Sequence, residues 1–214
     1  MTDKAKICSS LSKIAYGYIL ILVAVMIGTI DILPDFVGYI MMLYAIDALK
    51  DECKTITLLK PFGYVLAIWK FAFFILNAFG LQSVSFTEFE PASVFIYVIY
   101  VLSIIINIVV IYFDFQLLTE MSLLAKKYQA EGSNLNKTFI IRRNIYTVCM
   151  TSTFLISNIT NAFQDIPEDF RIILIIVPAA LSLFVMFLVV SALFSLRKTI
   201  RSSPDDETDE TICE

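Results

Sequence analysis

Histidine is absent from this chain, and only six of its 214 residues are glycine. The lack of histidine excludes Ser-His-Asp triads, His-Glu-x-x-His zinc sites and haem ligation by histidine. The glycines are scattered, so neither a glycine-rich phosphate loop nor a Gly-x-x-x-Gly helix motif occurs. We therefore expect a protein that is not an enzyme, with no metal site and no cofactor. A carboxylate-based membrane enzyme is the alternative that the residues leave open.

Charged residues are also scarce, at 17%, whereas hydrophobic residues make up 58% of the chain. A soluble domain has roughly 45–50% apolar residues, and a membrane span needs about 20 in succession. Six segments meet or approach that length: residues 11–30, 34–51, 61–79, 92–118, 144–163 and 172–196. We predict an all-α, polytopic membrane helix bundle with six transmembrane helices over residues 1–201. The first segment lacks an Ala-x-Ala-like cleavage site, so we expect a retained span.

Proline supports these boundaries, because Pro34, Pro61, Pro91 and Pro167 each fall at or just before the start of a segment. Pro178 lies inside the sixth segment and predicts a kink there. The second segment, residues 34–51, is the weakest, since its apolar stretch is short and Asp47 interrupts it. A re-entrant or tilted helix is the alternative there.

The basic residues predict the orientation. With the N-terminus inside, 14 of the 16 Lys and Arg residues fall on the cytoplasmic side, and only Arg171 falls outside. Lys70 lies within a span. This distribution follows the positive-inside rule and predicts that both termini are cytoplasmic. No basic recognition surface is visible, so we expect no nucleic-acid partner.

Two cytoplasmic features follow from residue patterns. Residues 202–214 hold six acidic and no basic residues, which predicts an acidic disordered tail. After Asp114, apolar residues keep helical spacing towards Gly132, which predicts that the fourth helix continues beyond the bilayer. That extension either packs beneath the bundle or docks a partner.

The first predicted outer loop reads Asp31-Ile-Leu-Pro-Asp35-Phe-Val-Gly-Tyr39. It resembles a motif of uncharacterised small bacterial membrane proteins, in which Asp-Ile-Leu-Pro-Asp-Phe-x-Gly-Tyr follows the first span. The resemblance covers about thirty residues of this chain. It implies a bacterial plasma (inner) membrane protein and implies no activity.

A second outer loop, at residues 165–170, repeats the combination of proline and acidic residues. A distant duplication is possible, and helix-capping chemistry that arose twice is the simpler interpretation. In the functional interpretation, the outer carboxylates attract a cation or a basic solute. The candidate residues of the two loops are Asp31, Asp35, Tyr39, Asp165 and Asp169.

Lys70 lies near the middle of the third segment. A lysine at mid-bilayer costs about 2.5–3.5 kcal/mol, so we expect it to face the bundle interior and to find a partner. Asp47 is the expected partner, because the two residues flank the same cytoplasmic turn, and Asn107 is the alternative. The pair is either a structural ion pair or part of a ligand site.

The fifth segment is unusually polar. It carries Thr147, Thr151, Ser152, Thr153, Ser157, Asn158, Thr160 and Asn161. Either the hydroxyls bond back to the carbonyls four residues earlier in a closely packed helix, or the helix lines a polar cavity. In the second case Asn158 and Asn161 are binding residues.

Together these features favour a small-solute transport or solute-binding membrane module. The alternative is a non-enzymatic interaction or regulatory subunit that acts through a partner protein. The expected partners are the lipid bilayer and either another membrane subunit or a small solute.

Overall fold

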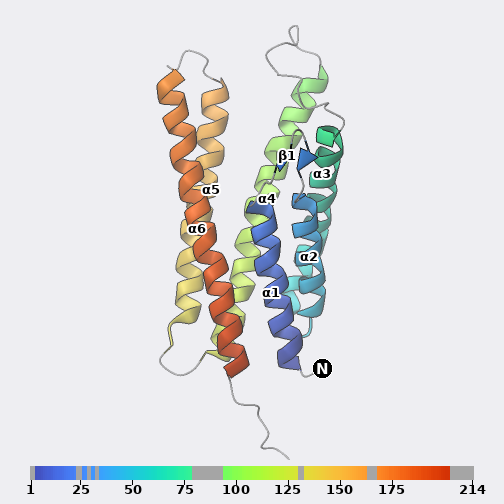
Figure 1. Cartoon of the computed structure of the whole chain (residues 1–214), viewed down its shortest axis with the longest axis vertical. Coiled ribbons are helices and arrows are strands. Elements are labelled where there is room, and N and C mark those ends of the chain that lie inside the picture. Colours follow the sequence, from blue (N-terminus) through green and yellow to red (C-terminus); the bar gives the residue numbers. More distant parts are fainter. Residues whose placement is uncertain are drawn as a thin grey trace, which may run out of the picture.

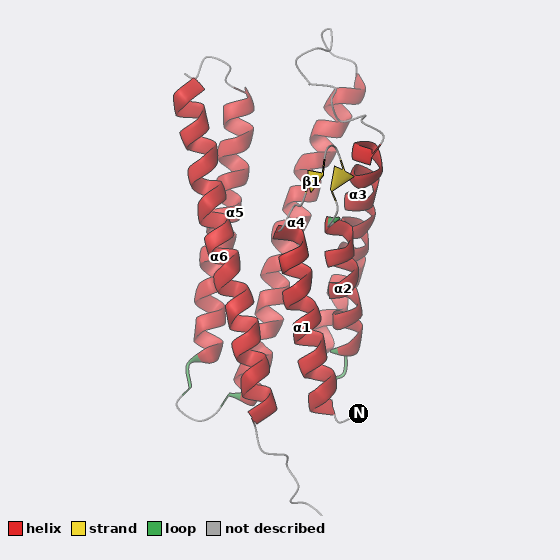
Figure 2. Ribbon diagram, viewed as in Figure 1, coloured by secondary structure: helices red, strands yellow, loops and turns green. Residues whose placement is uncertain are grey.

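The computed structural model describes residues 3–22, 26–27, 30–31, 34–78, 94–129, 133–162 and 168–202, in which six α-helices form an upright bundle (Figures 1 and 2). The helices are α1 (Asp3–Leu22), α2 (Asp35–Ala48), α3 (Lys60–Ala78), α4 (Val94–Tyr128), α5 (Leu135–Ala162) and α6 (Glu168–Ser202). The strands β1 (Met26–Ile27) and β2 (Ile30–Asp31) and the 3-10 helix η1 (Lys54–Leu59) complete the described elements. The predicted helical class is confirmed, and the acidic tail after Ser202 lies outside the described residues.

Four stretches of the described helices are long and apolar enough to cross a membrane: Lys4–Leu22, Lys54–Leu76, Tyr100–Tyr128 and Ile172–Ser202. Six helices are therefore found in the described part of the chain, and the expected count of six spans is not confirmed. Helix α2 has 14 residues, which is about 21 Å at 1.5 Å per residue and shorter than a hydrocarbon core of about 30 Å. Helix α5 has the required length and carries the polar residues noted above.

Several helices extend beyond their predicted ends on the side of the bundle that holds the N-terminus. Helix α4 continues to Tyr128, α5 starts at Leu135 and α6 ends at Ser202. The predicted helical continuation of α4 after Asp114 is confirmed, and most of its apolar side chains are buried in the core. Leu117 and Met121 are fully buried, whereas Leu123 is 53% exposed, so one face of this part of α4 packs within the chain.

The first segment differs from its prediction. Helix α1 starts at Asp3, eight residues before the predicted start, and it ends at Leu22 instead of residue 30. Beyond it, β1 and β2 pair antiparallel, with Ile27 opposite Ile30. Gly28 and Thr29 separate the paired strands in the sequence, and β-branched residues around a two-residue Gly-x link favour a hairpin over a helix. Helical periodicity alone overlooked this signal.

Helices α1 and α2 approach each other through a pair of glycines. A Cβ atom on Gly17 would lie 2.8 Å from the carbonyl oxygen of Gly38, and one on Gly38 would lie 2.6 Å from that of Gly17. Two backbones can approach this closely only where both residues lack a side chain. The Gly-x-x-x-Gly pattern requires both glycines in one helix, so it does not predict a pair that is shared between two helices.

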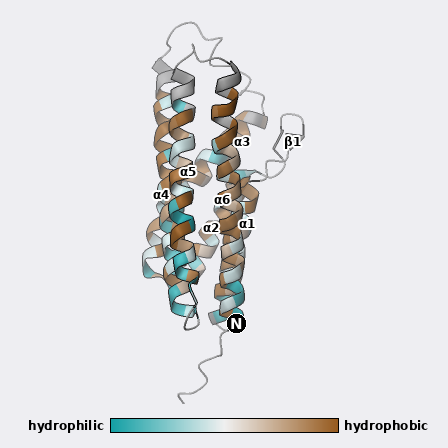
Figure 3. Ribbon diagram, turned by 90° about the vertical axis from the view of Figure 1, so that its left-hand side faces the viewer, coloured by the Kyte–Doolittle hydropathy of each residue, from teal (hydrophilic) through white to brown (hydrophobic). Residues whose placement is uncertain are grey.

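The core is concentrated in the half of the bundle nearest the N-terminus. There α1 packs against α2 and α6, and fully buried residues include Leu11, Ile56 and Leu196. Figure 3 shows polar residues gathered at this end and long hydrophobic stretches above it. Ile68 of α3 and Phe187 of α6 are both 68% exposed, which fits contact with lipid. Figure 1 shows that α1 and α2 end well short of the upper ends of α4, α5 and α6.

Candidate functional site

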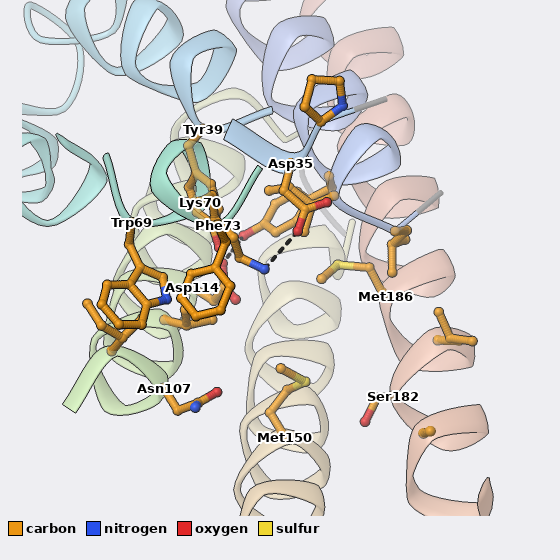
Figure 4. Close-up of a pocket in the computed structure, with 18 of the residues that line it drawn as sticks. Asp35, Tyr39, Trp69, Lys70, Phe73, Asn107, Asp114, Met150, Ser182 and Met186 are labelled. Carbon is orange, nitrogen blue, oxygen red and sulfur yellow. Dashed lines mark hydrogen bonds and ion pairs between the residues drawn. The ribbon is translucent and has the colours of Figure 1, made fainter. Parts of the chain in front are cut away.

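A cavity of about 690 Å³ lies among the six helices, and each helix contributes to its lining (Figure 4). The lining residues are Tyr18, Ile21, Leu22, Pro34, Asp35, Tyr39, Trp69, Lys70, Phe73, Phe74, Ser103, Ile106, Asn107, Val110, Asp114, Tyr146, Met150, Ala179, Ser182, Leu183 and Met186. This volume is in the range of small-molecule sites, which are mostly apolar with a few convergent polar groups. The charged residue types in this lining are Asp35, Lys70 and Asp114.

Lys70 and Asp35 form an ion pair at the cavity, with Nζ 2.7 Å from Oδ2. Their side chains are 33% and 24% exposed, so the pair is partly buried. The prediction that Lys70 faces the bundle interior and has a partner is confirmed. The predicted partner is wrong, because Asp47 instead pairs with Lys60 at the N-terminal end of α3.

The misassignment of the partner has a geometric cause. Asp47 and Lys60 lie on either side of the connection from α2 to α3, so Lys60 is closer to Asp47 along this connection than Lys70 is. Asp35 is the first residue of α2, and sequence reasoning placed it at the outer membrane face. The short α2 instead starts level with the middle of α3, where Lys70 lies. The predicted start of this helix, residue 34, was close to the observed one, so the error came from assuming that the segment crosses the membrane completely.

Asp114 is a second carboxylate in the lining, and it is only 4% exposed. The Tyr18 hydroxyl donates to its Oδ1 at 3.0 Å, and the Tyr146 hydroxyl donates to its Oδ2 at 2.7 Å. The three side chains come from α4, α1 and α5, so this cluster joins distant parts of the sequence. Two hydroxyl donors stabilise a carboxylate and fix its orientation. Among the described residues, no lysine or arginine pairs with Asp114.

Sequence reasoning missed this cluster. Asp114 was treated as the point where the fourth helix leaves the bilayer, although it lies within the predicted span 92–118. An acidic residue inside an apolar segment is a functional candidate for the same reason as Lys70. That rule identifies Asp114 from sequence, but nothing in the sequence identifies Tyr18 and Tyr146 as its donors.

Aromatic rings form much of the wall beside the ion pair. Trp69 and Phe73 pack with ring centroids 4.9 Å apart on α3. Tyr39 of the motif is 3% exposed, and its ring contacts Phe113 edge to face at 6.0 Å. Such walls suit an apolar or cationic ligand, because ring faces carry partial negative charge.

Uncharged polar groups lie away from the Asp35–Lys70 pair, where Figure 4 shows Asn107 and Ser182 with the apolar Met150 between them. The Asn107 side-chain amide donates to the Ser103 carbonyl at 2.8 Å, so Asn107 is not the partner of Lys70. The Ser182 hydroxyl lies 3.1 Å from that of Thr153 and donates to the Pro178 carbonyl at 2.9 Å. Pro178 lies inside α6 as predicted, and the kink stays a prediction.

The polar residues of α5 were expected either to bond back to the carbonyls four residues earlier or to line a polar cavity. Thr147 and Thr153 donate to the carbonyls of Arg143 and Cys149, four residues earlier, which confirms the predicted back-bonding for these two. Asn158 lies outside the cavity lining and accepts a hydrogen bond from the Tyr100 hydroxyl at 2.8 Å, which links α5 to α4.

Four of the ten predicted site residues therefore meet at the cavity. They are Lys70, Asp35, Tyr39 and Asn107. Asp47 and Asn158 lie elsewhere. The side chains of Asp31, Asn161 and Asp169, and the whole of Asp165, lie outside the described residues.

Comparison of the chain with protein families, with curated proteins and with solved structures finds no match. The resemblance of the motif to bacterial membrane proteins therefore stays a prediction. Within the described part of the chain, no three His, Cys, Asp or Glu side chains cluster where they could hold a metal ion.

Proposed function

We propose that this chain is a membrane module that binds a small solute in the cavity among its six helices, as a transporter or as a solute-binding subunit. One observation carries the proposal: ionisable residues of three helices, Asp35, Lys70 and Asp114, converge on one apolar cavity near mid-height of the bundle. Ionisable groups at that depth are costly to place in a membrane, and they commonly mark solute or ion sites.

We further propose that both termini lie in the cytoplasm and that α1 and α2 form a re-entrant hairpin. Asp35 starts α2 level with the middle of α3, and α2 is about 21 Å long, too short to cross a bilayer of about 30 Å. A hairpin that enters from the cytoplasmic side keeps Lys50, Lys54 and Lys60 on that side. The positive-inside distribution is then unchanged. In this proposal α3, α4, the more polar α5 and α6 provide the complete crossings, whereas α1 turns back with α2 although its stretch Lys4–Leu22 is long and apolar enough to cross. A bacterial inner membrane is proposed on the motif alone.

Two neighbouring alanines of α6 provide a matched test of solute binding. Ala179 lines the cavity, whereas the next residue, Ala180, is exposed on the bundle surface. Ala179→Phe should fill part of the cavity, and Ala180→Phe adds the same ring outside it. The proteins would be extracted in a mild detergent and weighed by native mass spectrometry. Their thermal stability would also be measured against a set of amines, amino acids, organic acids and sugars.

We expect a bound small molecule, or a stabilising solute, with the unmodified protein and with Ala180→Phe but not with Ala179→Phe. Equal retention by both variants would place the bound molecule elsewhere, as for an annular lipid. If no solute distinguishes the variants and a membrane protein co-purifies with both, the interaction or regulatory alternative replaces this proposal.

The re-entrant hairpin has a separate test. In a chain without its native cysteines, Ile30→Cys would be treated in intact cells with a polyethylene-glycol maleimide too bulky to enter the cavity. Ser85→Cys, in the predicted outer segment between α3 and α4, is the positive control. A re-entrant hairpin protects position 30 while position 85 reacts. Rapid reaction at both positions would restore the six-span topology.

A further inference from the structure

We infer that the solute is a small organic cation, an amine or ammonium compound, and that Asp114 is its counter-ion. This inference rests on the proposed function and names the chemical class of ligand that the cavity takes.

The charges of the lining determine the sign of the ligand. Three lining residues carry charge: Asp35, Lys70 and Asp114. Lys70 is already neutralised by Asp35 at 2.7 Å. Asp114 then remains as the lining carboxyl without a basic partner among the described residues. A bound cation supplies the positive charge that favours its ionised form, whereas a bound anion would have to break the Lys70–Asp35 pair and approach Asp114.

The hydrogen bonds of Asp114 leave room for such a ligand. Each carboxylate oxygen accepts one tyrosine hydroxyl, and an ionised carboxylate has about four acceptor positions. Both hydroxyls act as donors to Asp114 and hold it towards the cavity that it lines. An ammonium group brings the donors that the remaining acceptor positions lack.

The walls favour an organic cation over a metal ion. Ca²⁺ and Mg²⁺ require several oxygen ligands, and within the described residues no cluster of three acidic or thiol side chains exists. The aromatic rings of Trp69 and Phe73 offer faces to a cation, and the apolar lining suits a hydrocarbon body. The remaining space, about 690 Å³, accommodates a molecule of more than a few heavy atoms.

Three probes of nearly equal size separate charge from shape: 2-phenylethylammonium, 2-phenylethanol and 3-phenylpropanoate. Their binding to the full-length protein in detergent would be measured by calorimetry and by thermal stabilisation. Asp114→Asn removes the charge with little change of shape, and Asp47→Asn removes an exposed carboxylate as the matched control. Ala179→Phe reports whether any probe occupies the cavity.

We expect the ammonium probe to bind the unmodified protein about tenfold to a hundredfold more tightly than the alcohol, because a charged hydrogen bond is stronger than a neutral one. Asp114→Asn should remove this preference, and Asp47→Asn should retain it. The comparison of probes on the unmodified protein stands even if Asp114→Asn does not fold.

Equal binding of all three probes, or tighter binding of the carboxylate, overturns the inference. If that binding is lost in Ala179→Phe, the cavity still binds solutes and the proposed function stands. If none of the probes binds and the solute set also fails to distinguish Ala179→Phe from Ala180→Phe, both proposals fall.

Discussion

Asp35, the first residue of α2, lies 2.7 Å from the ammonium of Lys70, midway along α3. This contact fixes the relative depth of the two helices. It brings the motif, the mid-segment lysine and the cavity into one site.

Breaking this pair should destabilise the protein. Lys70→Met leaves the Asp35 carboxylate partly buried without a cation, and we expect a loss of about 1–3 kcal/mol in the free energy of unfolding. The loss should be smaller than the ~3–5 kcal/mol of fully buried pairs, because both side chains retain some exposure. Thermal or SDS unfolding in detergent measures it. The charge exchange Asp35→Lys with Lys70→Asp should recover part of the stability.

The control is Lys60→Met, which breaks the pair with the 59%-exposed Asp47. That change should cost clearly less than Lys70→Met, because the Asp47 side chain is largely exposed and water screens the pair. Equal losses for Lys60→Met and Lys70→Met would show that the Asp35–Lys70 contact does not hold α2 against α3.

Gly38→Ala should separate α1 from α2. Its Cβ would meet the Gly17 carbonyl oxygen at 2.6 Å, and backbone atoms cannot move aside as a side chain can. Overpacking of this kind costs about 1–3 kcal/mol. Gly63→Ala is the matched control, because its Cβ would meet Leu43 Cδ2 at 2.7 Å, the end of a flexible side chain. A larger loss for Gly63→Ala in the same unfolding assay would contradict the close backbone contact.

Tyr146→Phe removes the hydroxyl that donates to Oδ2 of Asp114. A buried acceptor that loses its donor costs about 1–3 kcal/mol, so we expect a clear loss of thermal stability. Tyr112→Phe, on the same bundle, removes the hydroxyl of a 46%-exposed side chain and should change little. If the two variants unfold alike, Tyr146 does not support Asp114.

Cys53 should react slowly with thiol reagents even in detergent, where the reagent reaches both ends of the bundle. It lies between α2 and η1 and is 7% exposed. Burial, with further contributions from Glu120 and Glu52, raises the pKa of the Cys53 thiol to about 11. Since only the thiolate reacts, alkylation at pH 8 should be at least about a hundredfold slower than for the same residue in SDS-unfolded protein.

The raised pKa also predicts how the alkylation rate of Cys53 changes with pH. The folded protein keeps the proton on Cys53 to higher pH than the unfolded chain does, so the rate should rise as pH increases from about 9 towards about 11. A rate that levels off near pH ~8.5–9, as for a free thiol, would contradict the burial of Cys53. Mass spectrometry of the alkylated peptide measures the rate.

The helices were largely predictable from the sequence, because apolar runs and prolines mark them locally. The end of the first helix was predicted wrongly, although Gly28-Thr29 is a short-range turn signal within the apolar run. The partner of Lys70 was also not predicted correctly. Asp47 is closer to Lys70 in the sequence, and a second helix that crossed the membrane completely would have placed Asp35 at the outer face, away from Lys70.

Asp114 was predictable only in part. It lies within an apolar segment of the sequence, and the cost of placing a carboxylate in a membrane was sufficient reason to name it as a candidate site residue. Its environment was not visible, because Tyr18 and Tyr146 lie 96 residues before it and 32 residues after it in the chain. Only the packing of α1 and α5 against α4 brings the three side chains together.

The unequal heights of the helices explain why the cavity exists. Helices α4, α5 and α6 continue upward where α1 and α2 have already ended, so fewer helices share the cross-section above that level than below it. The cavity lies beside the place where the shorter pair stops, because its lining includes Ile21 and Leu22 at the end of α1 and Asp35 at the start of α2. The number of turns in one hairpin therefore sets the depth of the site. Shortening α2 by a single turn would remove Asp35, the partner of Lys70, whereas Asp114 on α4 would keep its place in the lining.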